Sequence, residues 1–97
     1  MECTNVIKLR KLKGEFIERL NRTNYIIKYA NRSKITVEMI HQSQLIREYL
    51  EKDINICNSL LNNNIISSMD IEEFVNLSTF HISNIDNFLK TIERVIH

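Results

Sequence analysis

The fold is decided by residues 71–96, which read IEEFVNLSTFHISNIDNFLKTIERVI. One row of mostly apolar side chains recurs here at alternating spacings of four and three residues: Ile71, Val75, Ser78, Ile82, Ile85, Leu89, Ile92 and Ile96. A second row repeats every seven residues beside the first: Phe74, His81, Phe88 and Val95. This pattern predicts an amphipathic α-helix over residues 69–96 that packs against several other helices.

Two further amphipathic segments precede this helix. Over residues 37–61, apolar side chains recur with a helical period from Met39 to Leu61, and Thr36 is suited to cap the N-terminus of that helix. Over residues 5–31, an apolar stripe predicts the first helix. Within it, Gly14 costs about 1 kcal/mol relative to alanine, and we expect a kink or a close approach of another helix there.

The composition supports long elements joined by few turns. The 97 residues include one glycine and no proline, whereas sheets need frequent turns that depend on these residues. Helices of similar length joined by short polar turns run antiparallel to their neighbours. We therefore predict an all-α fold, with one domain spanning residues 1–97 as an up-down-up three-helix bundle. The alternative is an extended arrangement that completes its core by dimerisation.

The sequence also bears on location. No segment approaches the roughly 20 apolar residues of a membrane span, and the N-terminus lacks the apolar region of a signal peptide. We therefore expect a cytoplasmic protein without a membrane span. Its two cysteines, Cys3 and Cys57, are then reduced thiols.

Catalytic or metal-binding motifs are not evident. The sequence contains neither HExxH nor CxxC, and it has no glycine-rich phosphate loop. Glu38 and His41 have the spacing of bundle metal ligands, but the matching position before His81 is a serine. We expect His81 to be a half-buried packing residue that makes one hydrogen bond, and Cys57 to be a small core residue. No catalytic residue, metal, cofactor or small-molecule substrate is predicted.

Charge is distributed unevenly along the chain. Residues 1–34 contain nine basic and three acidic groups, whereas residues 35–97 contain four basic and nine acidic groups. The first interpretation is that the basic first helix complements the other two, within one bundle or in an oligomer. The second is that a basic cluster binds phosphate groups of nucleic acid or of an anionic membrane. This cluster is Lys8, Arg10, Lys11 and Lys13.

Against nucleic-acid binding, the net charge is only +1, and no aromatic residue interleaves the basic cluster to stack on bases.

The apolar stripes are wider than one three-helix core requires. Leu12 and Ile17 widen the stripe of the first helix, and Tyr25 and Tyr29 lie one turn apart on the same helix. Tyrosine is favoured at protein interfaces because it combines apolar area with a polar end. The two tyrosines therefore either line the rim of the core or bind a partner, and the four residues together predict a partner-binding surface.

These patterns predict a non-enzymatic protein–protein interaction module. It would be a small helical adaptor, chaperone or inhibitor acting through an apolar helix face, as a homodimer or as a subunit of a complex. One alternative is a small nucleic-acid-binding regulator that uses the basic cluster. Another is an immunity or antitoxin-like inhibitor.

Overall fold

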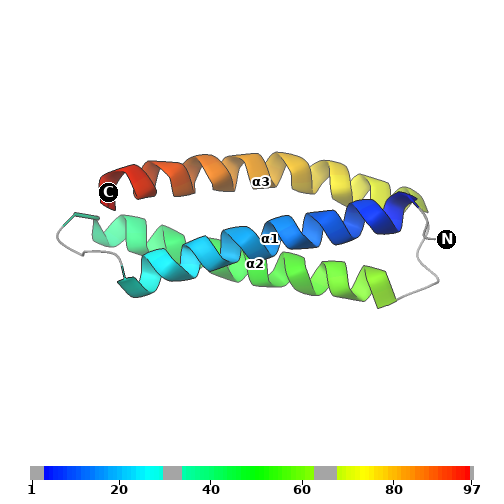
Figure 1. Cartoon of the computed structure of the whole chain (residues 1–97), viewed down its shortest axis with the longest axis horizontal. Helices are drawn as coiled ribbons and strands as arrows, with labels where there is room; N and C mark the ends of the chain where they lie inside the picture. The colour runs from blue at the N-terminus through cyan, green and yellow to red at the C-terminus, as the bar shows by residue number, and fades with distance from the viewer. Residues whose placement is uncertain (1–3, 30–33, 63–67, 97) are drawn as a thin grey trace.

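Three long helices run up, down and up, side by side (Figure 1). The computed structural model describes residues 4–29, 34–62 and 68–96, with side chains of the third helix described from residue 71. The helices are α1 (Thr4–Tyr29), α2 (Val37–Asn62) and α3 (Ser68–Ile96). They form a rod of 50 × 20 × 18 Å, without a strand among the described residues. The predicted all-α three-helix bundle is confirmed.

The helix boundaries agree with the predicted ones to within about two residues. Ala30 and Asn31, over which the first helix was expected to continue, lie outside the described residues, as do residues 63–67 between the second and third helices.

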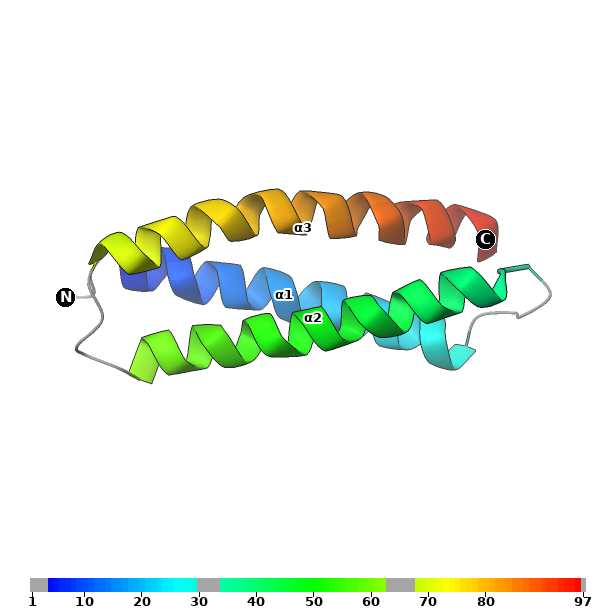
Figure 2. The same ribbon diagram turned by 180° about the vertical axis from the view of Figure 1, so that it is seen from behind.

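α1 is the helix on which the bundle is assembled. It packs along both α2 and α3, whereas α2 and α3 make few contacts with each other. Figure 2 shows this arrangement from the opposite side, with α1 behind and between the other two helices. The two later helices are therefore held in one bundle mainly by their common contact with α1.

The core lies along the inner faces of all three helices. The heptad row of α3 is buried as predicted: Ile82, Ile85, Leu89 and Ile92 are at most 7% exposed. α1 contributes Leu9, Phe16 and Ile26, and α2 contributes Leu50 and Cys57, all of which are almost fully buried. Long helices with only moderate intrinsic propensity are thus stabilised by their shared apolar faces.

Two hydroxyl side chains occupy fully buried positions in the apolar stripes. Thr23 Oγ1 donates a hydrogen bond to the Arg19 carbonyl at 2.7 Å, and Ser43 Oγ donates to the Met39 carbonyl at 2.8 Å. Each bond returns to the preceding turn of the same helix. These hydroxyls are therefore satisfied without a partner on another helix.

Thr36 caps α2 as predicted. The Met39 N–H donates to Thr36 Oγ1 at 3.0 Å, which satisfies one of the donors left free at a helix N-terminus. Ile35 and Ile40, on either side of the cap, are both buried in the core. This residue pair has the spacing of a hydrophobic staple and fixes the entry of the chain into α2.

Truncation of the α3 row tests this packing. Ile85→Ala should lower the free energy of unfolding by about 2–5 kcal/mol, because Ile85 is 5% exposed and its loss leaves a cavity. The matched control is Leu77→Ala on the same helix, where the side chain is 66% exposed and little should change. Urea unfolding followed by circular dichroism measures both. Equal stability of the two variants would contradict the register of α3.

Gly14 is not a site of close helix approach. A Cβ placed on this residue would meet nothing within 4 Å, and α1 continues through it as one helix. The expected close approach is therefore wrong, because the face of α1 that carries Gly14 is exposed rather than packed.

Gly14→Ala should accordingly stabilise the protein by about 1 kcal/mol, since alanine loses less backbone entropy in a helix. Thermal unfolding should show a rise in Tm of a few degrees. A fall in Tm would mean that the structure needs glycine at this position.

Candidate partner-binding groove

A groove open to solvent runs between α2 and α3. It consists of two adjoining hollows of about 350 and 310 Å³, which share Tyr49 and His81. We call this feature the α2–α3 groove. From α2 it is lined by Gln42, Leu45, Ile46, Tyr49 and Asp53, and from α3 by Phe74, Leu77, Ser78, His81, Asn84, Ile85 and Phe88.

The second heptad row of α3 forms one wall of this groove. Phe74, His81 and Phe88 are only partly buried, because they face α2 across a space that no further described helix fills. The rim is more exposed still, with Leu45 at 42%, Tyr49 at 55% and Leu77 at 66%. Phe80, one turn from Leu77 on α3, is 73% exposed. An apolar surface of this kind is typical of a site that binds another molecule.

Asp53 and His81 face each other across the groove. His81 Nε2 lies 3.6 Å from Asp53 Oδ2, which is too far for a hydrogen bond. Both atoms are buried and lack a hydrogen-bond partner. The hydrogen bond expected of His81 is therefore not formed at Nε2, although the ring meets Tyr49 edge-on at 6.2 Å between centroids.

Burial raises the pKa of Asp53, and the nearby charges of His81 and Lys52 only partly oppose this effect. The carboxylate is thus less stable in the groove than in water.

Ser78 lines the same hollow as Asp53 and His81. These residue types occur together in hydrolases, but His81 Nε2 has no hydrogen bond to a hydroxyl that it could activate. All three residues also lie inside continuous helices, where the backbone N–H groups are used within the helix and cannot stabilise an oxyanion. The arrangement is suited to holding a polar group rather than to acyl transfer.

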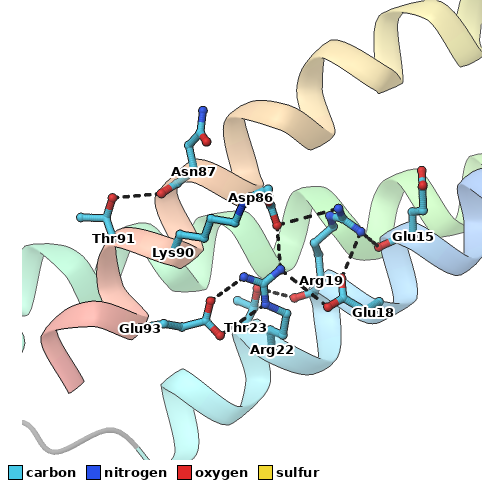
Figure 3. A network of polar contacts seen from close by, with 10 residues as sticks. All are labelled: Glu15, Glu18, Arg19, Arg22, Thr23, Asp86, Asn87, Lys90, Thr91 and Glu93. Carbon is cyan, nitrogen blue, oxygen red and sulfur yellow. Dashed lines mark hydrogen bonds and ion pairs between the residues drawn. The ribbon is translucent and has the colours of Figure 1, made fainter. Parts of the chain in front are cut away.

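A network of charged residues joins α1 to α3 on another side of the bundle. Figure 3 shows Arg22 of α1 between two acids of α3. Arg22 Nη1 donates to Asp86 Oδ1 at 2.7 Å, and Arg22 binds both carboxylate oxygens of Glu93 through Nη2 and Nε. We call these three residues the Arg22 clamp. Lys90 Nζ also lies 3.0 Å from Asp86 Oδ2.

The Arg22 clamp has a clear electrostatic effect. The hydrogen bond from Arg22, and to a smaller extent the one from Lys90, holds the pKa of Asp86 below its usual value. The hydrogen bond to the carboxylate of Glu93 raises the pKa of Arg22. A basic residue of α1 therefore pairs with acidic residues of α3 within one bundle, as the first interpretation of the charge pattern expects.

The predicted partner-binding residues of α1 do not form one surface. Leu12 is 3% exposed and belongs to the core, so little of its side chain is open to a partner. Ile17 is 40% exposed, and Tyr25 and Tyr29 are more than half exposed. The two tyrosine rings lie 5.2 Å apart, and Lys28 Nζ lies 5.2 Å from the Tyr29 ring centroid. The tyrosines remain a candidate surface on α1.

The basic cluster is split between two environments. Lys8, Arg10 and Lys11 are exposed, whereas Lys13 is half-buried and close enough to Cys57 to influence its thiol. Lys8 and Lys11 line a shallow hollow that also contains Glu15. The binding of phosphate by this cluster stays a prediction.

Cys57 is fully buried, and burial raises the pKa of its thiol to about 11. A thiol in this state is a poor nucleophile, as the predicted core role implies. Over the described parts of the chain, no group of three His, Cys, Asp or Glu side chains is placed to hold a metal ion.

None of the three described helices is long and apolar enough to cross a membrane. Comparisons with protein-family models, with curated proteins and with solved structures find no match to this chain. The fold and the groove are therefore the observations on which its function is argued.

The α2–α3 groove was not found from the sequence, although one signal for it is present. The second row of α3 repeats through Phe74, His81 and Phe88, which is more than a three-helix core needs. Leu45 and Asp53 carry no such signal, because their position depends on how far α2 stands from α3.

Loss of the Arg22 clamp should lower the free energy of unfolding by an amount that depends on pH. Arg22→Met should lower the free energy of unfolding by about 1–2 kcal/mol near pH 7, a value between those of exposed and buried ion pairs. Because the pKa of Asp86 is depressed, its contribution is present above its unfolded pKa of about 3.9 and is lost as the pH falls through the folded value. The difference between wild type and Arg22→Met should therefore shrink in acid.

Urea unfolding at several pH values measures this difference. Lys11→Met, an exposed change on the same helix, is the control and should have little effect. A difference between wild type and Arg22→Met that persists unchanged in acid would contradict an electrostatic origin.

Proposed function

We propose that this chain is a non-catalytic protein-interaction module that binds a protein partner, or a second copy of itself, through the α2–α3 groove. An adaptor, a chaperone and an inhibitor would all act in this way. Binding would bury apolar side chains of the two neighbouring helices, α2 and α3, against the partner.

The supporting observation is the apolar groove with an exposed rim. Leu45, Tyr49 and Leu77 are each at least 42% exposed along one continuous depression. Covering such side chains stabilises a complex by about 25 cal/mol for each Å² of apolar surface removed from water. The part of the opposing entropy cost that comes from ordering the backbone is small, because the groove is framed by two helices that are already formed.

The competing surface lies on α1, around Ile17, Tyr25 and Tyr29. Its two tyrosines pack on each other, and Lys28 covers one ring, so part of the apolar area is already shielded. No hollow described along α1 contains both tyrosines. The hollow beside Tyr25, of about 390 Å³, is lined by the charged side chains of Arg22 and Glu93, whereas the two adjoining hollows of the groove have a mostly apolar lining. The groove is therefore the surface to test first.

A pair of matched variants distinguishes the two surfaces. Leu45 and Ile17 are 42% and 40% exposed, so glutamate at either position should leave the fold intact. We expect Leu45→Glu to weaken self-association or partner binding by about tenfold or more, since it introduces a charge into the groove. Ile17→Glu should leave binding unchanged.

The measurements are the solution mass by light scattering and quantitative affinity purification from the native cells, each for wild type and both variants. The proposal is wrong if wild type is a monomer and Leu45→Glu recovers the same proteins in the same amounts as wild type. Loss of binding only in Ile17→Glu would assign the interaction to α1.

A further inference from the structure

We propose that the α2–α3 groove receives one amphipathic α-helix of a partner protein, and that this helix carries an arginine or lysine that pairs with Asp53. This inference rests on the proposed function and adds the chemistry of the partner. Its three supports are the shape of the groove, the state of Asp53 and the charge of the helices.

The dimensions of the groove fit a helix. Its lining extends over residues 42–53 of α2 and residues 74–88 of α3. At about 1.5 Å per residue, these segments are roughly 17 and 21 Å long, which corresponds to three or four turns of a docked helix. The two walls are antiparallel helices that both pack on α1. A helix in the groove would therefore occupy the fourth position of a four-helix bundle.

The state of Asp53 determines what this helix must carry. The residue lies opposite His81, at the midpoint of the α3 wall, and its Oδ2 atom is buried without a hydrogen-bond partner. A purely apolar helix would remove the remaining water from Asp53 and leave its buried Oδ2 atom without a hydrogen bond, with His81 Nε2 at 3.6 Å as its nearby polar group, which costs several kcal/mol. A guanidinium or ammonium group at this point removes that cost by donating to the carboxylate.

The charges of the three helices point to the same partner. α1 has seven basic and two acidic residues, whereas α2 and α3 carry net charges of −2 and −3. Asp86 and Glu93 of α3 are already paired with Arg22, and the acidic side chain that lines the groove is that of Asp53, with no arginine or lysine beside it in the lining. α1 already shows how a basic amphipathic helix binds α3, with its apolar stripe in the core and Arg22 between Asp86 and Glu93. A second copy docked groove to groove would instead offer Asp53 no arginine or lysine, because none lines the groove, and would bring a second Asp53 carboxylate to the same interface, which is unfavourable.

A displayed library of amphipathic helices tests the proposal directly. Each helix has about 18 residues, with every apolar-stripe position randomised, and it is selected against the full-length chain. Binders to wild type should be enriched about tenfold or more in arginine or lysine at one central stripe position. The enrichment should disappear with Asp53→Asn, which removes the charge but keeps the shape. It should remain with Glu51→Gln, which removes an exposed acid from the same helix.

The outcomes separate this inference from the function on which it rests. Binders that need Leu45 but show no central cation would overturn the pairing with Asp53 and leave the groove as a helix-binding surface. A wild-type dimer that Leu45→Glu dissociates would make a second copy the occupant and would also overturn the inference. If no binder distinguishes wild type from Leu45→Glu, and wild type is a monomer, both the inference and the proposed function fail.

Discussion

The packing of α1 against both other helices is the contact on which the rest of the structure depends. The buried side chains Leu9, Leu12 and Phe16 lie on α1, which packs along α2 and α3 while those two helices make few contacts with each other. Charge reinforces this arrangement, since α1 is basic and the other two helices are acidic. Because each later helix packs mainly on α1, no element among residues 4–29, 34–62 and 68–96 covers the space between α2 and α3 on the opposite side.

The open side between α2 and α3 contains two polar side chains whose burial costs stability. A half-buried Asp53 and a neighbouring His81, neither with a hydrogen bond at its buried atom, lower the stability of the isolated chain. Polar groups of this kind can specify the register of a helical partner, because only one alignment satisfies them. In the proposed complex, the same two residues would connect the packing of the bundle to the selection of the partner helix.

The sequence predicts the helices and the core well, because burial on an amphipathic helix follows a local period. The row from Ile82 to Ile92, the Thr36 cap and the core position of Cys57 are all confirmed. Leu12, predicted to lie on a partner-binding surface, packs in the core instead, because an apolar residue that widens a stripe can lie on either side of its boundary. The groove was missed because it depends on the separation of α2 and α3, which is a tertiary property.

The most direct test of the packing of α1 against α2 and α3 is a map of the close contacts between methyl groups in solution, obtained by nuclear Overhauser measurements on protein labelled at isoleucine, leucine and valine. The structure predicts more contacts from the methyl groups of α1 to α2 and to α3 than between the methyl groups of α2 and α3 themselves. A dense set of contacts joining α2 to α3, with α1 packed on only one of them, would contradict it.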